Sequence, residues 1–273
     1  MKNNIRGTVV GVMAAGIMAM TSLGGLFTMP VSADETVTVN GFTLAKKADN
    51  QPWTVVSYDG SSENAVIPDA VAPDGTIYDN PDATDIGPDK EIPAKYLVYY
   101  IDEDVLDDLS EVKTLQLPKF WSTKGTSFAE NLSKPLNKLK NLEAFYSNNS
   151  GDGLYTSEGA LYKGNVLYSY PQKKTGDYSI KDGTVSADER AFVNTNIDTL
   201  TIPEGFLVDN EKEQDYYKYT FLTSSIDYFE GANCVDGSVI INNRLVAYGN
   251  NSTADLTSIL SANPYAFKNE SIL

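Results

Sequence analysis

Acidic residues dominate the side chains that could do chemistry, and they gather in two runs. The first covers residues 79–85 (DNPDATD), and the second covers residues 102–108 (DEDVLDD). Because Ca²⁺ takes about six to eight oxygen ligands, both runs are candidates for a calcium site. Neither run has the glycine and the terminal glutamate of an EF-hand loop. We therefore predict solvated acidic surface at both places and no bound metal.

Catalysis has few residue types to draw on. The sequence has no histidine, which excludes Ser-His-Asp and Cys-His mechanisms and histidine-ligated zinc. Its one cysteine, Cys234, excludes an intramolecular disulfide and is predicted to be a small buried hydrophobic residue. Paired carboxylates can hydrolyse glycosides, but among 37 acidic residues such pairs arise by chance. The sequence therefore predicts a protein without enzymatic activity or cofactor; a carboxylate pair inside a deep cleft would instead indicate a hydrolase.

Tyrosine is the other abundant residue with a role in recognition. Three of the 17 tyrosines lie close together, at Tyr216, Tyr217 and Tyr219. An exposed tyrosine offers a large contact area with few rotatable bonds, which suits recognition of a protein or a sugar. Filling of the core is the alternative, and we expect it for Tyr162 and Tyr170. For the three clustered tyrosines both interpretations stay open, and we include them among the candidate binding residues.

The first 33 residues have the three parts of a secretory signal peptide. Lys2 and Arg6 precede an apolar stretch, and Val31-Ser32-Ala33 supplies small residues at the expected cleavage site. No second apolar run of membrane-spanning length follows, so we expect no membrane insertion after cleavage. Cleavage lowers the formal net charge from −16 to −18, and such a surface repels nucleic acid and anionic membranes. The chain is predicted to be secreted or held at the cell surface.

Short apolar motifs recur along the chain and predict the elements that position these residues. Residues 112–118 (VKTLQLP) return as residues 197–203 (IDTLTIP), and alternate apolar positions followed by proline indicate a short strand. Residues 158–170 return as residues 236–248, where Gly164-Asn165 and Asn242-Asn243 indicate β-hairpin turns. A looser copy of the hairpin covers residues 40–60.

Two further signals predict the packing of these elements. The pairs Ala191-Phe192 and Ala266-Phe267 are each expected in a short helical turn whose phenylalanine enters the core. The step from Leu117 to Leu142 is 25 residues, which lies within the span of roughly 20 to 29 residues for leucine-rich coils. We therefore predict an α/β repeat fold, a leucine-rich repeat solenoid that is strand-rich with short helical turns and inserted β-hairpins.

These residues resemble the BspA-like class of bacterial leucine-rich repeats. The motifs that carry the resemblance are residues 158–162 (EGALY), residues 168–171 (YSYP), Ala191-Phe192 and residues 197–203. The resemblance covers residues 112–273 well, so we expect a repeat array there, one that stops inside a repeat at its C-terminal end. Residues 34–111 are expected to be a divergent N-terminal repeat region. The resemblance implies a bacterial surface protein with roles in adhesion and protein binding, and it implies no catalytic residues.

The outward positions of the predicted strands are the candidate binding residues. If Leu200 and Ile202 point inward, Thr199 and Thr201 point outward, and Thr114 and Gln116 match them in the earlier strand. We expect these residues to bind an extracellular protein, either of a host matrix or of another microbial surface. The alternative is a glycan or cell-wall polymer, for which a row of exposed tyrosines in a groove would be expected.

Overall fold

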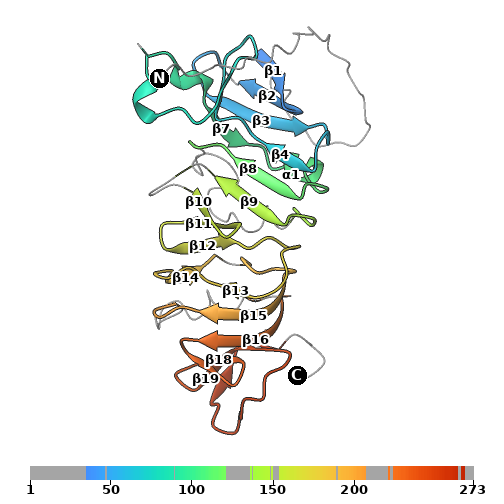
Figure 1. Cartoon of the computed structure of the whole chain (residues 1–273), viewed down its shortest axis with the longest axis vertical. Helices are drawn as coiled ribbons and strands as arrows, with labels where there is room; N and C mark the ends of the chain where they lie inside the picture. The colour runs from blue at the N-terminus through green and yellow to red at the C-terminus, as the bar shows by residue number, and fades with distance from the viewer. Residues whose placement is uncertain are drawn as a thin grey trace, which may run out of the picture.

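The computed structural model describes residues 35–46, 48–88, 90–120, 136, 138–147, 149, 154–188, 190–206, 221, 224–263 and 266–267. The predicted signal peptide, residues 1–33, lies outside this part of the chain. The described strands form six small sheets, and all but the two-stranded one follow one another along the long axis of the molecule (Figure 1). Blue strands from the N-terminal part lie at one end of this axis and red strands from the C-terminal part at the other.

Three of the sheets share one pairing pattern, with three antiparallel strands and a fourth strand added in parallel. The first consists of β1 (Glu35–Val39), β2 (Phe42–Lys46), β3 (Trp53–Tyr58) and β7 (Val98–Ile101). The second consists of β10 (Leu154–Ser157), β11 (Ala160–Lys163), β12 (Val166–Ser169) and β14 (Ser186–Ala187). The third consists of β17 (Cys234–Val235), β18 (Ser238–Ile241), β19 (Arg244–Tyr248) and β20 (Ser261–Ala262). We call these the hairpin sheets.

Two-residue turns explain why the hairpin sheets form. Glu158 and Gly159 join β10 to β11 with φ values of 50° and 81°. Asn242 and Asn243 join β18 to β19 with φ values of 51° and 58°. A two-residue turn with positive φ at both positions matches the right-handed twist of the strands that it joins. The hairpins predicted from Gly164-Asn165 and Asn242-Asn243 are confirmed, as is the antiparallel pair β2 and β3.

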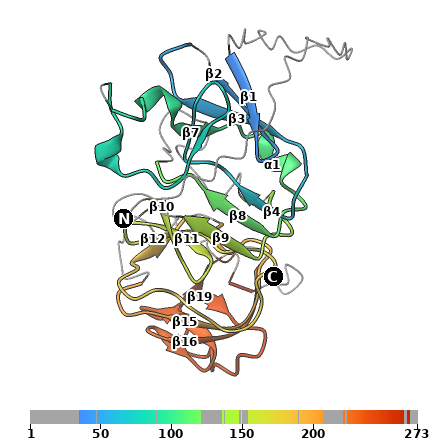
Figure 2. The ribbon, with the colours of Figure 1, turned by 45° about the horizontal axis from the view of Figure 1, so that its top comes forward.

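Two parallel sheets lie between the hairpin sheets. The first consists of β4 (Asn64–Val66), β8 (Thr114–Leu117) and β9 (Ala144–Ser147), and the second of β13 (Tyr178–Ser179), β15 (Asn196–Ile202) and β16 (Ser225–Gly231). The two strands that the recurring apolar motif predicts are therefore confirmed as β8 and β15. In both views β4 lies beside β8, and β15 lies beside β16 (Figure 1, Figure 2).

An additional region joins β4 to β7 and has a small core of its own. It contains β5 (Ala70–Val71), β6 (Ile77–Tyr78), η1 (Ala83–Asp85) and η2 (Ala94–Tyr96). Ala70, Ile92 and Leu97 are buried together there. The α-helix α1 (Val105–Asp108) follows β7 and buries Val105 and Leu106.

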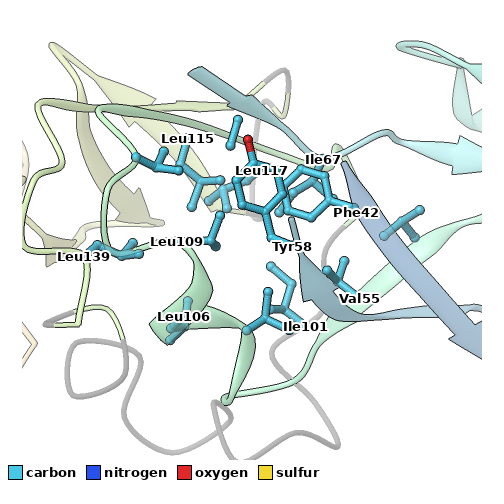
Figure 3. Close-up of a cluster of buried hydrophobic side chains, with 14 of the residues drawn as sticks. Phe42, Val55, Tyr58, Ile67, Ile101, Leu106, Leu109, Leu115, Leu117 and Leu139 are labelled. Atoms are coloured by element: carbon cyan, nitrogen blue, oxygen red, sulfur yellow. The ribbon is translucent and has the colours of Figure 1, made fainter. Parts of the chain in front are cut away.

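Two larger cores run through the sheets. In the first, Leu115 and Leu117 of β8 lie beside Phe42 and Tyr58, with Leu106 and Leu109 nearby (Figure 3). The second core extends from Ala160 to Ala247. Complete burial of a leucine or phenylalanine side chain stabilises a fold by about 1.5 to 3 kcal/mol, so these interiors hold the sheets together without a disulfide. The predicted boundary between residues 111 and 112 lies inside the first core, because Val105 and Leu115 both belong to it.

The structure contradicts the predicted leucine-rich repeat solenoid. Such a solenoid joins one strand from each coil into one long sheet, whereas the described strands form separate sheets of two to four strands. The α-helix α1 has only four residues. Between β9 and β13 the antiparallel strands β10, β11 and β12 pair with one another and therefore do not extend the parallel sheet. The protein is strand-rich and belongs to the β class.

The predicted helical turns are also wrong, although one of their phenylalanines is buried as expected. Phe192 is completely buried and lies 5.5 Å from Phe221 between ring centroids. It lies in a non-helical turn, because Arg190 and Asn194 have φ values of 68° and 57°. Phe267 is partly exposed and packs on Tyr248, with ring centroids 5.4 Å apart.

Candidate functional site

The outer surfaces of the two parallel sheets hold the candidate binding residues that the structure describes. On β8 the buried Leu115 and Leu117 alternate with the less buried Thr114 and Gln116. Alternate side chains of a strand point to opposite sides of its sheet, so Thr114 and Gln116 face outward. We call the outward surface of β4, β8 and β9, together with the exposed residue before each strand, the first face. The matching surface of β13, β15 and β16 is the second face.

Polar contacts order one end of the first face. The Thr114 hydroxyl donates a hydrogen bond of 2.7 Å to Asn64 Oδ1 on the neighbouring strand. Lys113 Nζ lies 2.6 Å from Glu63 Oε2. The hydrogen bond and the charge of Glu63, with a further contribution from Glu143, raise the pKa of Lys113. One lysine between two glutamates gives this row a net formal charge of −1.

Large apolar groups occupy the other end of the first face. Gln116 pairs in register with Val66 on β4 and Tyr146 on β9. The exposed fraction is 39% for Val66 and 51% for Tyr146, whereas Leu115 beside them is fully buried. A polar amide between two exposed apolar side chains resembles the mixed composition of protein contact surfaces.

The strands of the second face pair in the same register as those of the first, but the second face carries more acidic residues. Tyr228 on β16 pairs with Thr199, and Glu230 pairs with Thr201. The Thr201 hydroxyl donates a hydrogen bond of 2.7 Å to Glu230 Oε1. The side-chain amide of Asn250 donates a hydrogen bond of 2.8 Å to Asp227 Oδ1. Asp198 is exposed on β15.

Equivalent positions of the two sheets differ in charge. The backbone amide of Phe145 donates to Gly159 O at 2.8 Å, and that of Phe229 donates to Gly237 O at 3.3 Å, which aligns β9 with β16. By this alignment, the acidic residues Asp227 and Glu230 stand where the first face has Glu143 and Tyr146. The recurring motif likewise places Asp198 at the position of Lys113. The acidic residues of the second face are Asp177, Asp198, Asp227 and Glu230, a net formal charge of −4 with no lysine or arginine among the equivalent positions.

The predicted binding residues are divided between the two faces. Thr114 and Gln116 lie on the first face, and Thr199 and Thr201 lie on the second. The hairpin sheet of β10, β11, β12 and β14 lies between the two sheets, so the four residues do not form one surface (Figure 1). Tyr216, Tyr217 and Tyr219 lie outside the described residues.

Sequence reasoning missed the exposed side chains on the neighbouring strands. Tyr146, Val66 and Tyr228 are among the most exposed large hydrophobic residues of the described chain. β9 and β16 lack the final proline of the recurring motif, so their sequences did not stand out. In the sequence, the adjacent aromatic residues Phe145 and Tyr146 give no alternation that would tell which of the two side chains is buried.

In the first acidic run, a lysine of the chain occupies the position where a metal ion was considered. Lys119 Nζ lies 3.0 Å from Asn80 Oδ1 and 2.9 Å from the carbonyl oxygen of Pro81. The buried Asp69 accepts hydrogen bonds from the backbone amides of Asn80 and Lys119. Burial and then the charge of Asp69 raise the pKa of Asp79. Within the described ranges, no three acidic or cysteine residues are grouped so that they could hold a metal ion.

The second acidic run serves local structure. Asp108 Oδ2 accepts a hydrogen bond from the backbone amide of Tyr58 at 3.1 Å. Asp107 forms an ion pair of 3.1 Å with Lys138. These carboxylates therefore connect α1 to neighbouring segments.

The predictions for the tyrosines and the cysteine can be compared directly. Tyr162 and Tyr170 are buried in the second core, which confirms their predicted role. Cys234 is partly buried against the same core. Burial and then the charge of Glu230 raise the pKa of Cys234 to about 12, so the thiol is protonated at neutral pH. None of the helices in the described ranges is both long and apolar enough to cross a membrane.

Comparison with known proteins leaves the family open. No family model matches the chain, and no curated protein matches it. Among solved structures, the crystal structure of the pneumococcal vaccine antigen PcpA is similar at 13% sequence identity with a TM-score of 0.25. The similarity covers 63% of this chain and 65% of that chain. The matched region is therefore less than two thirds of the length of the PcpA chain.

Proposed function

We propose that this chain is a secreted or cell-surface protein, without enzymatic activity, that binds another extracellular protein through the outer faces of its parallel sheets. The observation that carries the proposal is the exposure of Tyr146 and Tyr228 on these two faces. Both tyrosines lie on strands whose neighbouring residues, Phe145 and Phe229, are buried. A large, rigid aromatic side chain among polar neighbours is the composition that protein interfaces favour.

Two features of the sequence support the export and adhesion parts of the proposal. Residues 1–33 have the charged, apolar and small-residue segments of a signal peptide. The motifs around Ala191-Phe192 and in residues 197–203 resemble those of BspA-like surface proteins. The target would be a protein of a host matrix or of another microbial surface.

The distribution of the tyrosines favours a protein over a glycan as partner. A glycan-binding groove would align several exposed tyrosines. In the described part of the chain, Tyr146 and Tyr228 are the most exposed tyrosines, and they lie on different sheets. The open faces of short sheets suit a protein surface better than a single sugar chain.

The test is binding of the purified chain to a panel of matrix proteins, microbial surface proteins and glycans at near-physiological salt. The double variants are Gln116→Ala with Tyr146→Ala on the first face and Thr201→Ala with Tyr228→Ala on the second. We expect at least one of them to weaken binding to a protein of the panel tenfold or more, equivalent to about 1.4 kcal/mol. Leu260→Ala is the control, because Leu260 is 83% exposed and lies on neither face.

Two outcomes would contradict the proposal. If both double variants bind every panel protein as the unchanged chain does, the faces are not the contact surface. If only glycans are bound, the glycan alternative replaces the protein partner.

A further inference from the structure

We propose that the second face binds an extended segment of its partner that carries lysine or arginine side chains. This inference rests on the proposed function and names the chemistry of the partner at one of the two faces. Three features support it: the charge of the face, the spacing of its carboxylates and the position of Tyr228.

The charge of the face selects for a cationic partner. The equivalent positions carry a net formal charge of −4 on the second face and −1 on the first. On the first face, Lys113 neutralises Glu63 directly at 2.6 Å. On the second face, Asp198 stands at the position of that lysine. Complementary charge across an interface increases the rate of association and excludes partners of the same charge.

The spacing of the carboxylates fits several separate cations better than one metal ion. Asp198 and Asp227 lie on adjacent strands, whose backbones are about 4.8 Å apart. Glu230 follows Asp227 by three residues along β16, which corresponds to about 10 Å. No metal-binding group of three acidic residues is found in the described ranges. Side chains of an extended peptide lie at distances similar to these.

Tyr228 adds an aromatic surface between the carboxylates. Its ring lies over Gly237, since a Cβ atom at that position would be 2.6 Å from Tyr228 Cδ2. Gly237 has a φ value of 86°, so both its backbone and the ring above it favour glycine there. The tyrosine remains 38% exposed. A lysine or arginine side chain on this ring would gain a cation–π contact while its charge pairs with Asp227 or Glu230.

The experiment measures fluorescence anisotropy of a labelled (Lys-Gly-Ser)₄ peptide with the full chain at about 150 mM NaCl. A labelled (Gln-Gly-Ser)₄ peptide is the control probe. The test variant combines Asp198→Asn with Glu230→Gln, and the matched variant combines Glu63→Gln with Glu143→Gln. Each variant removes two negative charges: the test variant removes them from the second face and the matched variant from the first.

We expect the test variant to weaken binding of the lysine peptide tenfold or more and the matched variant to change it less than twofold. Tyr228→Ala is expected to weaken binding about threefold, whereas Tyr228→Phe keeps the ring and binds as the unchanged chain does. Near-ultraviolet circular dichroism of each variant verifies that the fold is retained.

Absence of binding, or equal loss in both charge variants, would overturn the inference. The proposed function fails separately, by the panel experiment. Suppose that the second-face variant no longer binds a protein of the panel while the lysine peptide does not bind even the unchanged chain. The second face then binds a partner, but not through cationic side chains. If neither measurement responds to the second face, both proposals are wrong for that face.

Discussion

The two parallel sheets have the same strand register and bury leucines at equivalent positions, but they differ on their outward surfaces. Leu115 and Leu200 occupy equivalent positions, and both are fully buried. Outward, the first face presents Lys113, Gln116 and Tyr146, whereas the second presents Asp198 and Glu230. Close packing constrains inward side chains in volume and polarity, while outward side chains are free of that constraint. One backbone arrangement therefore carries two surfaces of different chemistry.

The largest effect is expected from the buried leucines, one in the core of each sheet. Leu115→Ala and Leu200→Ala should each lower the free energy of unfolding by about 3 kcal/mol, because each leaves a cavity at a fully buried position. Urea unfolding followed by circular dichroism measures both values. Losses of stability that differ by more than about 2 kcal/mol would contradict the equivalence of the two positions, since they would show that the two sheets are packed differently.

A smaller effect distinguishes the ends of the two sheets. Gly231 on β16 has a φ value of 96°, and a Cβ there would collide with the backbone oxygen of Ile202. Gly231→Ser should therefore cost about 2 kcal/mol. The equivalent residue on β9, Ser147, donates a hydrogen bond of 3.0 Å to Leu154 O, so Ser147→Ala should cost about 1 kcal/mol. Thermal unfolding would contradict this ranking if Gly231→Ser were as stable as the unchanged chain.

Exposed hydrogen bonds should contribute less on either face. Thr114→Val removes the bond to Asn64, and Thr201→Val removes the bond to Glu230. Each substitution keeps the branched shape of the side chain, and each should lower the free energy of unfolding by about 0.5 kcal/mol. Denaturant midpoints of the two variants should therefore agree with each other. A much larger loss of stability for Thr201→Val than for Thr114→Val would contradict this expectation, because it would mean that the Thr201 hydroxyl also holds the Glu230 carboxylate in place.

The smallest effect is a pH dependence that belongs to the first face. Glu63 raises the pKa of Lys113 above its usual value of 10.5, so their interaction stabilises the fold below about that pH. The contribution disappears as the pH rises through the raised pKa. The melting temperature of the unchanged chain should exceed that of Glu63→Gln slightly near neutral pH, and the gap should close above pH 10.5. Asp198→Asn, at the position of the second face that corresponds to Lys113, should show no such pH-dependent gap.

Much of the local structure was predictable from the sequence. The alternation in residues 112–118 and 197–203 gave β8 and β15, and Asn242-Asn243 gave a hairpin turn. These features depend on neighbouring residues, because turn conformation and strand alternation act over a few positions. Residues 71–111 showed no clear repeat, and they contain the additional region with η1 and η2.

The predicted solenoid failed because recurring motifs do not specify hydrogen-bond partners. Strands β10, β11 and β12 pair among themselves, which divides the sheets. For the same reason, the sequence predicted the outward residues of β8 and β15 but not those of the strands beside them. Thr114 and Gln116 were identified as outward, but the motif does not say which strands lie beside β8, so their neighbours Val66 and Tyr146 were missed.

Apolar alternation and positive-φ turn residues act locally, so the sequence alone indicated which side of β8 and β15 is buried and that the chain reverses direction at Asn242-Asn243. Which strands lie side by side depends instead on the tertiary structure. Asn64 and Thr114 share a hydrogen bond across 50 residues of sequence, and Tyr228 meets Thr199 on an adjacent strand. Such pairs form because the buried sides of distant strands pack into one core, and that packing sets which outward side chains share a face.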